Sequence, residues 1–182
     1  MAKEKHGFAI WLTGLPSSGK STLANLLAKQ LNKPGVQVKV LDSDELRKIL
    51  TPKPTYSPQE RDWFYKVLAH IGYLLTDAGV NVIFAATANK RSYRTRARKL
   101  FKNFLEVYVQ CPLETCMKRD TKGLYAKAKT GQTITMPGLQ DSYEIPKNPE
   151  VTVETNRQSP DESIQKIIGK LKNLYLLKSE LP

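Results

Sequence analysis

Gly14-Leu15-Pro16-Ser17-Ser18-Gly19-Lys20-Ser21 is the stretch from which the fold of this 182-residue chain can be predicted. It matches the pattern G-x-x-x-x-G-K-[ST] at every fixed position. The apolar run 8–13 precedes it and a helical pattern over 21–31 follows it, which is the context that a phosphate-binding loop needs. We therefore predict a loop that binds the phosphates of ATP or GTP. The sequence has no clear N-K-x-D motif for guanine, which favours ATP.

The residue types in this loop suit a polyphosphate. Glycines at 14 and 19 let backbone N–H groups turn toward phosphate oxygens, and the start of the following helix adds partial positive charge. Lys20 can reach the β- and γ-phosphates, and the Ser21 hydroxyl can ligate Mg²⁺. The nucleotide-binding residues predicted from the loop are Gly14, Ser17, Ser18, Gly19, Lys20, Ser21 and Thr22.

Outward from the loop, apolar β-rich runs alternate with longer helical patterns. We predict strands over 8–13, 36–41, 80–86, 104–109 and 151–155. We predict helices over 21–31, 45–50, 57–76, 91–102, 112–119 and 160–177, with Ser57 as the N-cap of the third. Continuously apolar strands that alternate with helices indicate an α/β three-layer sandwich, with a mostly parallel sheet of about five strands. The length suits a single domain over residues 1–182.

Composition limits the partners. The chain has 29 Lys and Arg against 17 Asp and Glu, a formal net charge of +12, which indicates an anionic partner. No apolar run approaches the roughly 20 residues of a membrane span, and the N-terminus does not resemble a signal peptide, so we expect a cytoplasmic protein without membrane association. Cys111 and Cys116 form no C-x-x-C, which argues against structural zinc and a disulfide framework.

A segment between the fourth strand and the last one breaks the alternation. The residues from Lys122 to Lys147 are mostly polar, with a short helical signal over 125–129 and turn residues at Gly131, Pro137, Gly138 and Pro146. Long irregular segments in compact domains are often functional. We predict a mobile lid, at about 119–147, that covers a bound ligand.

Two carboxylates follow the second predicted strand. Asp42 and Asp44 would lie at the carboxyl edge of the sheet near the phosphate loop, where ligands bind in open parallel sheets. One could accept a proton from a hydroxyl group or assist Mg²⁺ from an outer shell. Alternatively, Asp42 or Ser43 could cap the helix predicted over 45–50, and both roles can coexist. Arg47, one turn past Asp44, could bind an anionic acceptor.

Several further segments carry a resemblance to a known family. Asp42-Ser43-Asp44-x-x-Arg47 resembles D-G-D-x-x-R, and Tyr56-Ser57-x-x-x-Arg61 resembles F-S-x-x-D-R. The residues 119–128 resemble the most specific motif, R-D-x-K-G-L-Y-x-K-A. From about Phe8 to the C-terminal helix, the chain resembles the adenylylsulfate kinases, P-loop enzymes that phosphorylate the ribose 3′-hydroxyl of adenylyl sulfate (APS) with ATP.

The resemblance implies an ATP- and Mg²⁺-dependent kinase of sulfate assimilation. Lys20 and Mg²⁺, ligated by Ser21, would bear charge on the transferred phosphoryl group, and Asp42 or Asp44 would orient or deprotonate the acceptor. Arg119 would contact the ATP adenine or phosphates. The implied partners are ATP and an anionic, nucleotide-like acceptor, and a homodimer remains open. The implied acceptor-site residues are Asp44, Arg47, Tyr56, Arg61, Arg91, Lys122, Gly123, Leu124 and Met136.

Four departures from the family pattern fall on the acceptor side. Ser43 replaces a glycine, Phe64 an asparagine, Ala88 a serine, and Met136 the aromatic residue that would stack on the acceptor's adenine opposite Tyr56. Kinase activity is therefore better supported than APS specificity. A related kinase that acts on another nucleotide-like acceptor, such as a cytidine diphosphoramidate, remains open.

A basic stretch supplies a competing hypothesis. The window 90–102 contains seven basic residues and no acidic one. It could form a nucleic-acid patch in a non-catalytic nucleotide- or nucleic-acid-binding protein. We favour a solvated helix face, because only Tyr93 interleaves the charges and no nucleic-acid-binding motif is present. The intact Lys20, Ser21 and aspartate pair also argue against a non-catalytic protein.

Overall fold

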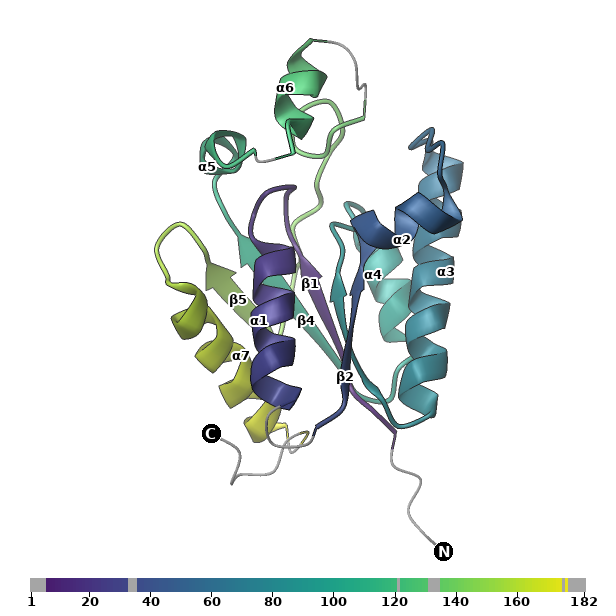
Figure 1. Cartoon of the computed structure of the whole chain (residues 1–182), viewed down its shortest axis with the longest axis vertical. Coiled ribbons are helices and arrows are strands. Elements are labelled where there is room, and N and C mark those ends of the chain that lie inside the picture. The colour runs from purple at the N-terminus through teal and green to yellow at the C-terminus, as the bar shows by residue number, and fades with distance from the viewer. Residues whose placement is uncertain (1–5, 33–35, 121, 131–134, 175, 177–182) are drawn as a thin grey trace, which may run out of the picture.

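The computed structural model contains one sheet of five parallel strands in the part of the chain that it describes (Figure 1). The described residues are 6–32, 36–120, 122–130, 135–174 and 176. The strand order is β2-β3-β1-β4-β5, and every pair of neighbours is parallel. The strands are β1 (Ala9–Thr13), β2 (Val38–Asp42), β3 (Asn81–Ala85), β4 (Phe104–Gln110) and β5 (Val151–Glu154). The helices are α1 (Lys20–Asn32), α2 (Ser43–Leu50), α3 (Pro58–Asp77), α4 (Arg91–Arg98), α5 (Leu113–Lys118), α6 (Leu124–Lys129) and α7 (Pro160–Asn173).

The helices cover both faces of the sheet. Helices α1 and α7 pack on one face, α2, α3 and α4 lie on the other, and α5 and α6 stand beyond the carboxyl ends of the strands (Figure 1). The predicted three-layer α/β sandwich is confirmed, and the sheet is wholly parallel. None of the helices in the described part of the chain is long and apolar enough to cross a membrane.

The central strand β1 supplies both halves of the core. Its side chains alternate between the two faces: Ile10 and Leu12 join the cluster under α1 and α7, whereas Ala9 and Trp11 join the cluster under α3 and α4. Trp11 is fully buried and stacks on Phe84, with ring centroids 4.5 Å apart. A strand buried on both faces explains why this segment is apolar at nearly every position.

Ser57 caps α3 as predicted. Its hydroxyl accepts a hydrogen bond from the Glu60 backbone N–H at 3.2 Å, and Pro58 occupies the first turn. The Glu60 carboxylate accepts hydrogen bonds from the backbone N–H and the hydroxyl of Thr55, at 2.6 and 2.7 Å. The start of α3 is thereby joined to the preceding loop.

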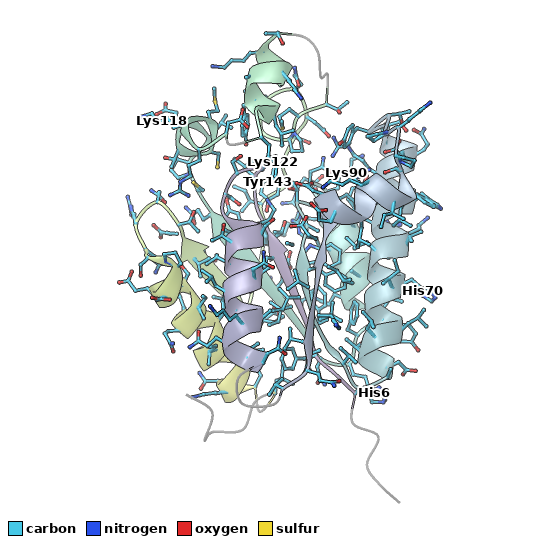
Figure 2. All side chains as sticks on the ribbon, in the orientation of Figure 1. His6, His70, Lys90, Lys118, Lys122 and Tyr143 are labelled. Carbon is cyan, nitrogen blue, oxygen red and sulfur yellow. The ribbon has the colours of Figure 1, made fainter. Side chains whose placement is uncertain are left out.

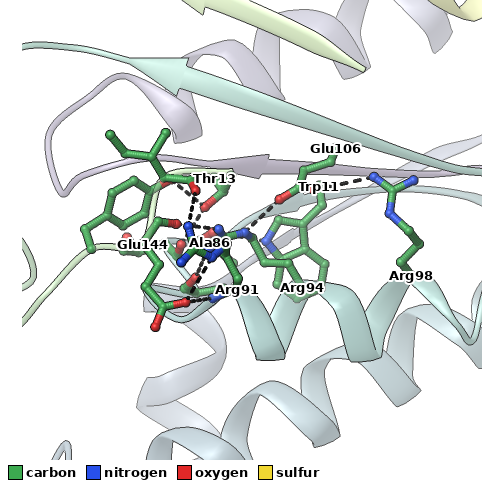
Figure 3. Close-up of polar contacts among 12 residues, drawn as sticks. Trp11, Thr13, Ala86, Arg91, Arg94, Arg98, Glu106 and Glu144 are labelled. Carbon is green, nitrogen blue, oxygen red and sulfur yellow. Dashed lines mark hydrogen bonds and ion pairs between the residues drawn. The ribbon is translucent and has the colours of Figure 1, made fainter. Parts of the chain in front are cut away.

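The basic helix α4 differs from the prediction. It ends at Arg98, not at residue 102. Its face is not simply solvated, because Arg94 is only 1% exposed and its Nε donates to Glu106 Oε1 at 2.7 Å (Figure 3). The Arg94 guanidinium also donates to the carbonyls of Ala88 and Glu144. The charge pattern of residues 90–102 could not predict the burial of Arg94, because its partners Glu106 and Glu144 lie outside that stretch of sequence.

We expect substitution of Arg94 by Met to lower the free energy of unfolding by about 3–5 kcal/mol, because it removes the shortest ion pair of the partly buried Glu106 carboxylate and leaves it only the longer contact with Arg98, at 3.4 Å. The matched control is Arg96→Met on the same helix. Arg96 pairs with Asp62, and because both side chains are more than a third exposed, the loss should stay within about 1 kcal/mol. Urea denaturation measures both. Equal losses in the two variants would show that burial of the Arg94 pair is unimportant.

Candidate functional site

The loop of residues 14–19 connects β1 to α1 at the centre of the sheet edge. Two residues in it adopt left-handed backbone conformations, Ser17 with φ 60° and Gly19 with φ 100°. At Gly14, a Cβ atom would lie 2.4 Å from the carbonyl oxygen of Val109, so only glycine fits beside β4. The sequence pattern thus reflects the close approach of this loop to β4 and its tight turn into α1.

Lys20 lies beneath the loop. Its side chain is largely buried, and its Nζ donates to the carbonyls of Gly14 at 3.1 Å and Leu15 at 2.7 Å. Burial lowers the pKa of Lys20 from 10.5 to about 8, even though the negative charges of Asp44 and Asp42 oppose that shift. A buried ammonium group that titrates near neutrality is well placed to respond to an incoming anion.

Asp42 links the loop to α2. Its Oδ2 accepts a hydrogen bond from the Ser21 hydroxyl at 2.5 Å, and its Oδ1 accepts one from the Asp44 backbone N–H at 2.8 Å. Asp42 is therefore the N-cap of α2. Of the two capping residues considered from the sequence, Asp42 and Ser43, the structure selects the first.

A pocket of about 610 Å³ opens above the loop and is called here the loop pocket. The predicted site residues that line it are Ser17, Gly19, Lys20, Ser21, Thr22, Asp42, Asp44, Arg119, Lys122 and Leu124. Gly14 and the buried Ser18 belong to the loop beneath it. Sequence analysis missed Thr87, Thr155, Gln158 and Ser163, which also line it.

Thr155, one of the pocket residues that were not predicted, contacts the phosphate loop. Its hydroxyl donates to the Ser18 carbonyl at 2.9 Å. Arg119 donates to the Thr155 hydroxyl at 3.2 Å and to its carbonyl at 2.7 Å. The available signal was the position of Thr155 just after β5, at the same sheet edge as the loop.

A second pocket, of about 470 Å³, lies between α2, the start of α3 and the segment around Met136, and is called here the arginine pocket. The predicted residues that line it are Asp44, Arg47, Tyr56, Arg61, Lys122, Leu124 and Met136. Both pockets are lined by Asp44, Thr87, Lys122 and Leu124, so the two spaces adjoin. The structure therefore brings together residues from four separate stretches of sequence.

The two arginines are held by different partners. Arg47 forms an ion pair with Glu60 at 3.0 Å. Arg61 donates from Nε to the carbonyl of Tyr56 at 3.0 Å and from Nη2 to that of Thr135 at 2.6 Å. The pKa of Glu60 is below its usual value: burial opposes the shift, but hydrogen bonds from Thr55 and Tyr56 and the charge of Arg47 outweigh it. Glu60 therefore stays ionised beside Arg47.

Asp44 and Lys122 form an ion pair at the boundary between the pockets. Lys122 Nζ lies 2.7 Å from Asp44 Oδ2, and both side chains are about half exposed. The hydrogen bond to Asp44 raises the pKa of Lys122. Lys122 lies near the carboxyl edge of the sheet in Figure 2, whereas His6 lies at the opposite end of the molecule.

Two predicted acceptor residues lie outside both pocket linings, as far as the described residues define them. Arg91 instead contacts the last residues of the predicted lid, with its Nε 3.4 Å from Glu144 Oε2 and its Nη1 donating to the Ile145 carbonyl. Gly123, with φ 64°, provides the left-handed N-cap position of α6. Its conformation turns the chain between Lys122 and Leu124. Of the predicted lid, Thr121 and residues 131–134, including Gly131, lie outside the described residues.

Three comparisons relate this chain to known proteins. A family model described as adenylylsulphate kinase matches residues 6–154. The "Probable adenylyl-sulfate kinase" of Pyrococcus abyssi is 44% identical over 171 residues, which cover 94% of this chain and 98% of that protein. The adenylyl-sulfate kinase of Thermodesulfovibrio yellowstonii is 42% identical over 168 residues, which cover 91% and 84%.

A solved structure is also similar. The Mycobacterium tuberculosis APS kinase, in complex with AMPPNP and APS, superimposes with a TM-score of 0.87 at 36% sequence identity. The match covers 92% of this chain and 98% of that one. The family model spans all the residues that line the arginine pocket and most of those that line the loop pocket, whose residues 155–163 lie beyond its match.

We expect Asp42→Ala to lower the free energy of unfolding by about 1 kcal/mol, because it removes the N-cap of α2. Asp42→Asn should retain most of the stability, since an asparagine oxygen caps as well as a carboxylate does. Chemical denaturation of the two variants and the wild type makes the comparison. If the asparagine variant loses as much stability as the alanine variant, then Asp42 acts through its charge and not as a cap.

Proposed function

The chain belongs to the adenylylsulphate kinase family, and we propose that it transfers the γ-phosphoryl group of ATP to the 3′-hydroxyl of adenylyl sulfate. The observation that carries this proposal is the junction of the two pockets. The phosphate loop opens into one and a pair of arginines into the other, and Asp44 lines both. A donor and an acceptor bound in these pockets would meet at Asp44.

In the loop pocket, the residues of the phosphate loop bind ATP. Backbone N–H groups of the loop and the N-terminus of α1 face the phosphates, and Lys20 supplies a positive charge that follows the transferred group. Arg119, held by Thr155 at the pocket wall, contacts the adenine or the phosphates. The contacts made to the phosphates strengthen as negative charge develops on the phosphoryl oxygens.

The residues around Ser21 fit a magnesium ion. The Ser21 hydroxyl and the Asp42 carboxylate are hard oxygen donors, 2.5 Å apart, at the floor of the loop pocket. Ser21 would hold the ion directly and Asp42 would hold it from the outer shell. When bound, Mg²⁺ neutralises charge on the β- and γ-phosphates.

The arginine pocket binds adenylyl sulfate. Arg47 and Arg61 neutralise its acidic groups, and Tyr56 and Met136 provide the walls for its adenine ring. The thioether of Met136 packs on a ring face less directionally than an aromatic side chain would. Lys122, Leu124 and Met136 all come from the lid, so this segment covers both substrates.

Asp44 is the residue that accepts or orients the acceptor's hydroxyl proton. Asp42 is committed to the cap of α2 and to Ser21, whereas the Asp44 carboxylate is held, among the described residues, by the half-exposed Lys122. Asp44 can therefore exchange its partner for the acceptor hydroxyl without disrupting a helix. This division of roles assigns the metal side to Asp42 and the proton to Asp44.

The direct test is an assay with ATP, Mg²⁺ and a panel of acceptors. We expect equimolar ADP and 3′-phosphoadenylyl sulfate from ATP and adenylyl sulfate, and slow turnover with GTP. If a cytidine diphosphoramidate is phosphorylated and adenylyl sulfate is not, the departures at Ser43, Phe64, Ala88 and Met136 mark a changed acceptor. Absence of ADP formation with every acceptor would contradict a kinase.

Asp44→Asn should lower kcat by about 10²- to 10⁴-fold with little change in the KM for ATP, because it removes the group that receives the proton. The matched control is Asp161→Asn, which alters another carboxylate in the first turn of a helix, α7. Steady-state kinetics with adenylyl sulfate measures both. An Asp44→Asn enzyme that keeps the wild-type kcat would exclude Asp44 as the base.

ATP binding should weaken above pH 8, because Lys20 loses its proton there. With a pKa of about 8 in the free protein, about one-tenth of Lys20 is neutral at pH 7 and about nine-tenths at pH 9. Phosphates favour the charged form and raise this pKa, so binding at pH 9 takes up a proton. Calorimetry with a non-hydrolysable ATP analogue in two buffers of different ionisation enthalpy measures the uptake. Lys20→Arg stays charged, so its ATP binding should neither weaken above pH 8 nor take up a proton. If this variant takes up as many protons as the wild type, the proton binds to another group.

A further inference from the structure

Arg47 carries an unsatisfied group in the arginine pocket. The residue is 7% exposed, and its Nη1 donates to Glu60 at 3.0 Å and, more weakly, to Thr51 at 3.4 Å. Its Nη2 is buried and has no hydrogen-bond partner among the described residues. A buried guanidinium nitrogen without a partner is costly, which indicates that a ligand oxygen supplies the missing bond.

Aromatic rings surround the same guanidinium. Arg47 Cζ lies 3.8 Å from the ring centroid of Phe64, 4.9 Å from that of Tyr56 and 5.9 Å from that of Tyr65. Phe64 is fully buried on α3, and its own ring is fixed edge-on against Tyr65. The nearest aromatic contact of the cation is therefore the face of a buried ring, at a distance typical of strong cation–π interaction.

The hydrogen bonds of Arg47 alone do not fix the orientation of its guanidinium group. Nη1 is committed to the ionised Glu60, so the Arg47 head group could still rotate about that contact. A ring face 3.8 Å from Cζ limits this motion, because the guanidinium must stay over the face to keep the cation–π contact. An aliphatic side chain at position 64 would fill the space without restricting the orientation.

We propose that Phe64 is a positioning residue for the acceptor: its ring holds the Arg47 guanidinium so that Nη2 is available to one anionic oxygen of adenylyl sulfate. This inference rests on the proposed function of the arginine pocket. Position 64 is also one of those at which this sequence departs from the family pattern. At this position the Phe64 ring, which contacts the Arg47 guanidinium, replaces the asparagine of the family pattern.

The experiment compares three variants by steady-state kinetics and melting temperature. Phe64→Met keeps the apolar volume and removes the ring, and should raise the KM for adenylyl sulfate about tenfold while the KM for ATP and kcat stay within about twofold. Phe64→Tyr keeps the ring and should keep the KM near the wild-type value. The control, Phe101→Met, makes the same change in the same core cluster and should lower only the melting temperature.

The variant Arg47→Ala tests the proposed function of Arg47 separately from the role of Phe64. Arg47→Ala should itself raise the KM for adenylyl sulfate, and in the double variant Phe64→Met should raise that KM hardly any further. An unchanged KM in folded Phe64→Met, or an equal rise in Phe64→Tyr or Phe101→Met, would overturn the role of Phe64. An unchanged KM in Arg47→Ala would instead remove Arg47 from the acceptor site. If Phe64→Met does not fold, calorimetric binding of adenylyl sulfate to Phe64→Leu replaces it, with the same expected loss.

Discussion

Parallel pairing of every strand is the constraint on which the rest of this structure depends. Because all five strands run in one direction, their carboxyl ends meet at one edge, and each connection must cross a face of the sheet. The register sets Asp42 of β2 level with Ala85 of β3, and Leu12 of β1 level with the same residue. The loop after β1, the cap of α2 and Thr87 therefore meet at this edge, although they are far apart in sequence.

Buried arginines then connect the outer elements to that edge. Arg94 joins α4 to Glu106 on β4 and to the carbonyl of Glu144, in the segment between α6 and β5 (Figure 3). Arg47 joins α2 to Glu60 on α3. Each guanidinium loses water on burial, which is offset only while its partners remain in place. Of the two, the Arg47–Glu60 pair joins α2 to α3, two of the helices that line the arginine pocket.

The parts of the fold that could be predicted are those with local signals. The phosphate loop, the five strands and the Ser57 cap each depend on residues within a few positions of one another. The burial of Arg94 and the placement of Arg91 could not be predicted in this way, because their partners at Glu106 and Glu144 are 12 and 53 residues away. Thr87 and Thr155 line the loop pocket because of the order of the strands in the sheet, which the phosphate-loop motif does not specify.

The two aspartates at the end of β2 and the start of α2 show how the same residue type takes different roles a short distance apart. Displacing Asp42 would remove the first hydrogen bond of α2 and release Ser21, at a cost of about 1 kcal/mol or more. Displacing Lys122 from Asp44 breaks a half-exposed ion pair, which contributes about 1 kcal/mol or less. In the proposed mechanism, an acceptor hydroxyl would thus replace Lys122 at low cost. Since Lys122 belongs to the proposed lid, the same exchange would free one lid contact when the acceptor binds.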